Sequence, residues 1–192
     1  MHPRPTEDKE LPQEALYADD SDFVSTSPSF LQSLEALIPP TIGQFKLQAN
    51  AAKWERTMLT TSANDDSRPS WRTVKKLGSL LGDEEDIERR KFLATASFKS
   101  LRLLWERRNI TSINTRIRAY NALVVPVLLY NCGTWGVTGG VIEKLEVFHR
   151  RQLREVLGVR RGIHNDDLYK RCKANPLKHQ IAWAKWSLFG HT

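Results

Sequence analysis

The chain has 192 residues, among them six tryptophans, and a formal net charge of +7. This length is enough for one full domain or two smaller units, and the apolar residues are numerous enough to fill a core. The longest apolar run, residues 122–129, is too short to cross a bilayer, so we expect no membrane protein.

The charge is distributed unevenly along the chain. Residues 1–88 carry a net charge of −7, and residues 89–192 carry a net charge of +14. An acidic front half favours metal ions, whereas a basic rear half suits a phosphate backbone. The asymmetry therefore indicates contact with nucleic acid, although solvated helix faces produce a similar pattern.

Cysteine usage bears on the compartment. Cys132 and Cys172 are far apart and form no CxxC motif, which is typical of reduced thiols in an intracellular protein, in the nucleus, the cytoplasm or both. A zinc site that combines these cysteines with His149, His164 and His179 is conceivable. The spacings match no zinc finger or knuckle, so we expect none.

The N-terminal part predicts a β-hairpin that carries carboxylates. Residues 1–13 are polar and lack the apolar segment of a signal peptide, which predicts a disordered lead. Residues 15–25 place Asp19 and Asp20 between two short runs of alternating apolar and polar residues. Alternation predicts strands, and Asp-Asp at the join predicts a tight turn whose carboxylates are free to hold Mg²⁺. A purely structural Asp-Asp turn is the alternative interpretation.

The next segments predict a helix and further strands. Residues 27–38 predict a helix, because a Ser-Pro pair favours its start and the following Pro-Pro pair stops it. Residues 44–50 alternate as a strand does, and a second short strand is expected near residues 57–60. After a polar link at residues 61–70, residues 73–82 predict two short strands that meet near a glycine.

From residue 83 the apolar period becomes helical. Residues 83–105 predict one long amphipathic helix, whose acidic start and basic end complement the helix dipole. A second helix is expected over residues 113–124, with a kink at Pro126. The residues expected on the inner face of the long helix are Ile87, Lys91, Ala94, Phe98, Leu101 and Trp105.

Three more helices are expected toward the C-terminus. The third helix of this region buries residues between Ile142 and Leu153 and is closed by Gly158. Shorter helices are expected from Asn165 and Pro176. The predicted fold class is α+β, a small antiparallel part of β-hairpins plus a helix, followed by an all-helical basic module.

Four segments in chain order resemble a known family. The motif Tyr17-Ala18-Asp19-Asp20, the stretch from Lys46-Leu47 to Asn50 and Lys53, and Lys76-Leu77-Gly78-Ser79 are similar to the last three palm motifs of reverse transcriptases. The basic helical region, with its motifs at residues 128–135 and 145–154, resembles the thumb of non-LTR (LINE-type) retrotransposon polymerases. The resemblance covers about residues 12 to 192.

The resemblance implies a C-terminal palm and thumb fragment of an RNA-directed DNA polymerase. Residues 1–13 are then a lead, residues 14–82 the C-terminal part of the palm, and residues 83–192 the thumb and downstream region. The full-length parent is expected to extend a DNA primer on an RNA template with dNTPs, by two-metal phosphoryl transfer with Mg²⁺.

The resemblance also implies roles for individual residues near the reaction centre. Asp19 is expected to be a metal ligand, with Asp20 as its acidic neighbour. Tyr17 is expected beside the primer or template terminus. Lys53 is expected to approach the triphosphate and to protonate the departing pyrophosphate. Trp54, the next residue, stands where the family has a threonine.

Further residues are implied as contacts to nucleic acid. Leu77 and Gly78 are expected to form the hairpin that steadies the primer strand, because Gly allows close backbone approach. Arg150, Arg151 and Arg154 are expected to hold the phosphates of the template–primer duplex.

Arg160 and Arg161 are candidates of the same kind. They stand between Gly158 and Gly162, where they fit either phosphate contact or a charge effect at a helix end.

The remaining aromatic and histidine candidates favour structural roles. Trp105, Trp135, Trp183 and Trp186 are expected in the core or at interfaces rather than as base-stacking platforms. His149, next to two arginines, is expected to face solvent or phosphate and not to act as a general base.

Completeness of the catalytic site decides whether the chain is itself an enzyme. A reverse transcriptase also needs an earlier palm segment with another metal-binding aspartate, and the residues before the hairpin supply none. We therefore expect the chain to be inactive alone. The alternatives are a non-catalytic nucleic-acid-binding helical module, which needs only the basic half, and a relic without a stable fold.

Overall fold

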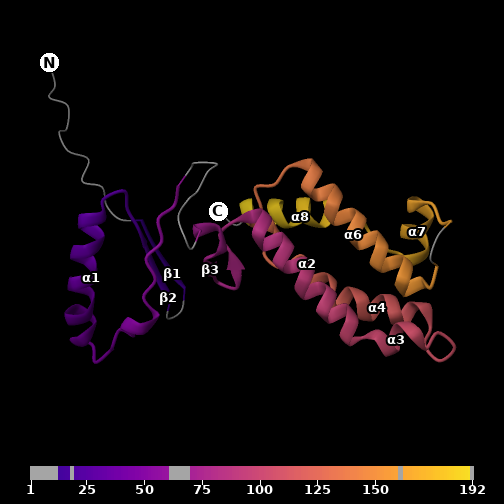
Figure 1. Ribbon diagram of the computed structural model, residues 1–192, viewed down its shortest axis with the longest axis horizontal. Helices are drawn as coiled ribbons and strands as arrows, with labels where there is room; N and C mark the ends of the chain where they lie inside the picture. Colours follow the sequence, from indigo (N-terminus) through magenta and orange to yellow (C-terminus); the bar gives the residue numbers. More distant parts are fainter. Residues whose placement is uncertain (1–12, 18–19, 61–69, 160–161, 191–192) are drawn as a thin grey trace, which may run out of the picture. The chain divides into compact units, whose positions relative to one another are not determined.

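The computed structural model describes residues 13–17, 20–60, 70–159 and 162–190, with residues 13–17 and 20 described by their backbone. The chain forms two compact units, Met1–Arg56 and Thr57–Thr192, and each is described here by itself (Figure 1). The hairpin predicted near Gly78 belongs to the second unit, together with every α-helix after the first.

The first unit contains the predicted hairpin of β1 (Gln13–Tyr17) and β2 (Asp20–Val24), which pair antiparallel. In its register Tyr17 lies opposite Asp20, and Gln13 lies opposite Val24. The strands therefore meet where the Asp-Asp pair predicts the turn. Residue 19, the first of the two aspartates, lies outside the described residues.

Helix α1 (Pro28–Gly43) follows, and its start agrees with the prediction. The Ser27 hydroxyl accepts a hydrogen bond from the backbone N–H of Phe30. The predicted end at residue 38 is wrong, since the helix continues through the Pro39-Pro40 pair. Each proline removes one N–H from the backbone ladder, but its φ is close to that of a helix, so the pair weakens α1 without ending it.

The predicted strands at residues 44–50 and 57–60 are wrong. After α1 the backbone turns back on itself, and the Phe45 and Lys46 amides donate to carbonyls of the last helical turn. Lys46 has a φ of 61°, which interrupts any extended run. The apolar residues of this alternation, Phe45 and Leu47, are exposed. Alternation predicts a strand only where a neighbouring strand and a core are available to it.

The second unit begins with a single 3₁₀ turn, η2 (Trp71–Thr73), and a short antiparallel hairpin. Strands β3 (Lys75–Lys76) and β4 (Ser79–Leu80) pair so that Lys76 lies opposite Ser79. The prediction of two short strands that meet near Gly78 is confirmed.

The predicted helix over residues 83–105 is interrupted. It forms α2 (Asp83–Ser100) and α3 (Arg102–Glu106), separated at Leu101. The Phe98 carbonyl accepts from the Leu101 amide and, at 2.8 Å, from the indole N–H of Trp105. The indole is buried and its ring stacks on Phe98, so Trp105 lies in the core although the helix is broken before it.

The second predicted helix is α4 (Ile113–Leu123), whose first turn is capped by Ser112. The chain then breaks at Val124 and continues as α5 (Val125–Leu128), with Pro126 in its first turn. The predicted kink at this proline is confirmed. The missing N–H of proline costs nothing in the first turn of a helix.

The remaining helices also agree with the prediction. After the 3₁₀ turn η3 (Cys132–Thr134) come α6 (Gly139–Leu157), α7 (Asn165–Cys172) and α8 (Leu177–Phe189). Gly158 ends α6 with a φ of 80°, a left-handed conformation that suits glycine. No helix of the described residues has the length and apolarity that a bilayer crossing requires.

The core of the second unit lies between its helices. Helix α2 packs against α5, α4 packs against α6, and α6 contacts both α7 and α8 (Figure 1). The largest apolar side chains that are fully buried are Trp135, Leu128, Leu145, Leu153, Leu168, Leu177 and Ile181. The described part of the chain is thus mostly helical with small antiparallel hairpins, an α+β arrangement.

His149 corrects one sequence expectation, because it is buried in this core and does not face solvent. The Tyr120 hydroxyl donates to Gln152 Oε1 at 3.0 Å and lies 2.8 Å from His149 Nδ1. Since the hydroxyl has one proton, Nδ1 carries the imidazole proton and donates it to Tyr120 Oη. His149 Nε2 keeps its lone pair, and no described residue offers it a donor. Arg150 and Arg151 directly follow His149 in the chain, but the His149 ring is buried.

Burial gives His149 a pH-dependent effect on stability. Desolvation, with a smaller contribution from the charge of Arg150, lowers its pKa from 6.5 to about 4. The unfolded state therefore binds a proton below pH 6.5 that the folded state does not bind until pH 4. Stability contributed by neutral His149 is complete above pH 6.5 and is lost as the pH falls toward 4.

We expect the free energy of unfolding, measured by urea titration, to fall by about 2 kcal/mol between pH 7 and pH 5 through His149 alone. His149→Gln should remove this part of the pH dependence. The exposed His179 provides the matched control, and His179→Gln should leave the dependence unchanged. A pH profile that is the same in wild type and His149→Gln would contradict the assignment.

Candidate nucleic-acid interface

The β1–β2 hairpin carries the predicted catalytic carboxylates. Asp19 lies outside the described residues, and Asp20 begins β2, where it lies opposite Tyr17. Asp22 lies two residues further along the same strand, so the pleat places it on the face of Asp20. The backbone thus sets two aspartate positions on one face of the strand. The described residues contain no group of three or more metal-binding side chains.

Lys53, the predicted triphosphate contact, lies at the end of the short 3₁₀ turn η1 (Ala51–Lys53) and is exposed. The Asn50 side chain caps this turn by accepting from the Ala52 amide at 3.2 Å. The segment therefore replaces the expected strand and turn with a capped single turn. Lys53 belongs to the same unit as the carboxylate hairpin.

The turn between β3 and β4 has an unusual backbone. Leu77 has a φ of 46° and Gly78 a φ of 84°, so both residues adopt the left-handed region that closes a two-residue hairpin. This conformation suits Gly78, whereas a leucine adopts it only where the surroundings enforce it. The Leu77 side chain is exposed to about half its surface. The hairpin therefore presents an apolar side chain on a strained turn.

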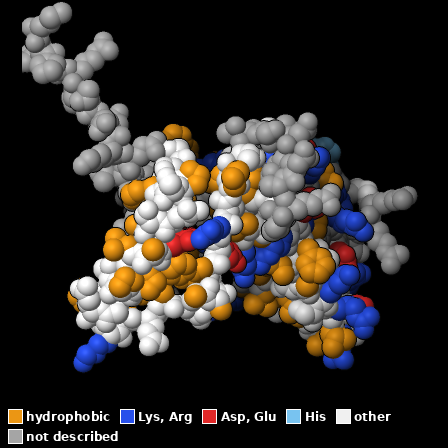
Figure 2. All heavy atoms as spheres, turned by 60° about the vertical axis from the view of Figure 1, so that its left-hand side comes forward, with side chains coloured by type: hydrophobic (Ala, Val, Ile, Leu, Met, Phe, Trp, Pro, Cys, Tyr) orange, Lys and Arg blue, Asp and Glu red, His pale blue; other side chains and the backbone are white. Residues whose placement is uncertain are grey.

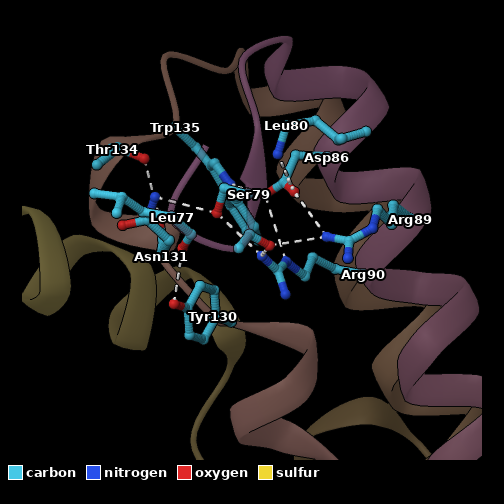
Figure 3. A network of polar contacts seen from close by, with 11 residues as sticks. Leu77, Ser79, Leu80, Asp86, Arg89, Arg90, Tyr130, Asn131, Thr134 and Trp135 are labelled. Carbon is cyan, nitrogen blue, oxygen red and sulfur yellow. Dashed lines mark hydrogen bonds and ion pairs between the residues drawn. The ribbon is translucent and has the colours of Figure 1, made fainter. Parts of the chain in front are cut away.

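The surroundings that enforce this turn are hydrogen bonds to its two carbonyls (Figure 3). The Tyr130 hydroxyl donates to the Leu77 carbonyl at 3.0 Å. The Gly78 carbonyl accepts from Arg90 at 2.6 Å and from Arg89 at 2.9 Å. Charged donors make the stronger hydrogen bonds, so the turn is held from α2 on one side and from Tyr130 on the other.

The Asp86 carboxylate lies beside the two arginines that donate to the Gly78 carbonyl. Its buried carboxylate accepts from the Leu80 amide at 2.9 Å and from the indole N–H of Trp135 at 3.3 Å, and it lies 3.5 Å from Arg90 Nε. Arg90 is buried too, and its guanidinium lies over the Tyr130 ring at 4.3 Å. A buried ion pair is stable only when further hydrogen bonds satisfy both charges, and these contacts meet that requirement.

Sequence reasoning missed this support of the turn. Asp86 and Arg90 stand at positions i and i+4 of a strongly acidic helix start, a pattern that indicates a surface ion pair far more often than a buried one. Asn131, at a φ of 60°, donates to Ser79 at 3.2 Å and had no sequence signal. Ser79 and Asn131 are 52 residues apart in the chain, and Asp86 and Trp135 are 49 residues apart, so local sequence patterns do not connect them.

The predicted basic contacts lie on α6. Arg150 donates to Glu143 at 2.6 Å and is largely buried, whereas Arg154 donates to Asn165 at 2.8 Å. Arg151 is exposed. Figure 2 shows one face of the molecule, on which blue Lys and Arg side chains lie among orange apolar and white groups. Of the three arginines, Arg151 is the one whose side chain is most available to a phosphate.

Arg160 and Arg161 lie outside the described residues, so their predicted phosphate contacts stay predictions.

The two cysteines are inert in this fold. Cys132 and Cys172 are free thiols and both are buried. Burial raises the pKa of Cys172 to about 11 and raises the pKa of Cys132, which keeps both protonated and unreactive at neutral pH.

Comparisons of the chain with protein-family models, with curated proteins and with solved structures gave no match. The similarity to reverse transcriptases rests on the four sequence segments alone.

The Asp86 network yields a stability prediction. Asp86→Ala leaves the Arg90 charge buried without its carboxylate and removes an acceptor from Leu80 and Trp135, so we expect a loss of about 3 kcal/mol in the free energy of unfolding. Glu88→Ala on the exposed face of the same helix breaks only a surface ion pair with Lys91 and should cost less than about 1 kcal/mol. Urea titration measures both values. Equal losses would show that the network does not carry the hairpin.

Proposed function

We propose that the chain is the palm and thumb part of a non-LTR retrotransposon reverse transcriptase, whose second unit holds the RNA template and the DNA primer. The observation that carries the proposal is the strained β3–β4 turn. Its two carbonyls are held from within the protein, and Leu77 is presented outward at the point where the resembling family contacts its primer strand. Four motif-bearing segments in the family's order add support.

The proposal assigns two different tasks to the second unit. The Leu77-Gly78 turn contacts the primer strand through an apolar side chain and a backbone that approaches closely. The exposed Arg151, with Arg150 and Arg154 on the same helix, contacts phosphates and supplies affinity without sequence preference. Both tasks need a rigid support, and the network around Asp86 and the core beneath α6 supply it.

The catalytic carboxylates belong to the first unit in this proposal. Asp19 and Asp20 hold Mg²⁺ together with an aspartate from an earlier palm segment, and Lys53 approaches the triphosphate of the incoming dNTP. The Mg²⁺ ions supply charge neutralisation and activation of the primer hydroxyl. The residues of this chain contribute one side of that site.

The phosphate contacts are tested by binding of an RNA–DNA hybrid duplex. Neutralising Arg150, Arg151 and Arg154 together to glutamine should weaken binding about tenfold or more at 0.1 M salt and make the slope of log K against log salt shallower. The control changes the same charge elsewhere, at the exposed Arg102, Arg118 and Arg171.

Two further measurements complete this test. Asp19→Ala should leave duplex binding nearly unchanged, because that residue serves catalysis. A flat salt slope of the wild type, or equal losses in the arginine variant and in its control, would overturn the proposed interface.

The primer contact is tested by Leu77→Asn. Asparagine tolerates a positive φ better than leucine, so the free energy of unfolding should stay the same or rise by up to about 1 kcal/mol. Binding of the hybrid duplex should nevertheless weaken, because the apolar side chain is lost. Leu103→Asn, on a similarly exposed leucine of α3, is the control and should leave binding unchanged.

The combination of the two readouts, stability and duplex binding, makes the Leu77 experiment decisive. A change that maintains stability and weakens binding identifies a contact residue rather than a structural one. If duplex binding depends on the α6 arginines but not on Leu77, the second unit is a non-catalytic nucleic-acid-binding module.

A further inference from the structure

The last helix, α8, is firmly fixed by its inner face. Leu177 and Ile181 are fully buried, and the 3₁₀ turn η3 packs closely against the helix. Gly133 lies so near the Ala184 carbonyl that a Cβ in its place would lie 3.1 Å from that oxygen. The outer face of α8 is therefore presented to its surroundings in a defined orientation.

Large aromatic side chains of α8 are exposed: Trp183, Trp186 and, at the end of the helix, Phe189 at 68%. Trp183 is 74% exposed and Trp186 is 76% exposed, in contrast to the buried Trp105 and Trp135. All four of these tryptophans are expected in the core or at interfaces. This expectation is confirmed for Trp105 and Trp135, whereas Trp183 and Trp186 lie outside this core. Tryptophan is among the most buried residues on average, and exposed apolar patches mark interaction sites.

The charge of α8 indicates which kind of partner fits the tryptophans. The helix carries Lys178, Lys185 and His179, and it contains no Asp or Glu. It also belongs to the half of the chain with a net charge of +14. A helix surface that combines aromatic rings with cations, and that has no carboxylates, is complementary to a polyanion with flat apolar groups. Nucleic acid has this chemistry, because each base has a π-face and each phosphate a negative charge.

Stacking on exposed tryptophans requires bases that are not paired. Trp183 and Trp186 are three residues apart on one helix, which corresponds to a rise of about 4.5 Å along the axis. In a duplex the bases stack on one another and offer no free face, whereas a single strand can place its bases on protein side chains.

We propose that the outer face of α8 binds single-stranded nucleic acid by stacking bases on Trp183 and Trp186, with Lys178 and Lys185 attracting the phosphates. This surface is independent of the turn at Leu77 and of the α6 arginines. It adds a single-strand site to the proposed duplex interface and exists whether or not the chain derives from a polymerase.

The test measures binding of a fluorescent oligouridylate of about ten nucleotides by anisotropy. Changing Trp183 and Trp186 together to alanine should weaken binding about thirtyfold or more, because stacking of each base contributes separately. The double change to phenylalanine should retain most of the affinity. Phe92→Ala, at an aromatic residue of α2 that is 73% exposed, is the control and should bind as the wild type does.

Salt dependence separates the two kinds of contact on α8. The tryptophan variant should keep the wild-type slope of log K against log salt, since stacking releases no counterions. Changing Lys178 and Lys185 to glutamine should make the slope shallower. All variants alter exposed or half-exposed side chains, and an unchanged urea midpoint verifies their fold.

Several outcomes would overturn this proposal. The first is an alanine variant that binds oligouridylate as tightly as the wild type does. Sedimentation as a dimer that the alanine changes convert to a monomer, without any effect on oligonucleotide binding, would assign the face to a second copy of the chain. Binding to phosphatidylserine vesicles in place of the oligonucleotide would assign it to a lipid surface. Loss of RNA–DNA duplex binding in the arginine variant, with oligouridylate binding intact, would instead support a site separate from the proposed duplex interface.

Discussion

The buried carboxylate of Asp86 organises the part of the molecule on which the proposed interface depends. It accepts from the β4 backbone and from the Trp135 indole, and it pairs with Arg90. Through Arg90 it also fixes the Gly78 carbonyl. One group thus joins the hairpin, α2 and the segment around η3. A buried charge tolerates little rearrangement, because each lost partner leaves a desolvated group behind. The strained Leu77 turn is possible because this network is rigid.

A second set of buried polar contacts organises the other end of the unit. The Glu146 carboxylate accepts from the Tyr169 hydroxyl at 2.6 Å and from the Lys178 amide at 2.8 Å, so it ties α7 and the start of α8 to α6. Tyr120 and His149 join α4 to the same helix. Hydrogen bonds of this kind add directional constraints that apolar packing lacks. The surfaces of α6 and α8 are consequently presented in fixed orientations, as an interface requires.

Much of the fold follows from local sequence signals. Both hairpins, the starts of α1 and α4, the kink at Pro126 and the glycine that ends α6 are predicted correctly, since turns, caps and prolines act over a few residues. The failures have different causes. The alternation at residues 44–50 pairs with no described strand, and at Leu101, where the long predicted helix breaks, the Trp105 indole donates to the Phe98 carbonyl seven residues back. Neither contact can be read from the period of the apolar residues.

The candidate site divides in the same way. The sequence by itself determined which residue types stand at the candidate positions: the aspartates of the first hairpin, Leu77 and Gly78 at the second, and the arginines of α6. Only the tertiary structure decided their environment. It engages Arg150 with Glu143, leaves Arg151 exposed, buries His149 and exposes the tryptophans of α8. The reason is physical, because charge and hydrophobicity are properties of a residue, whereas burial and partnership arise from segments that the fold brings together.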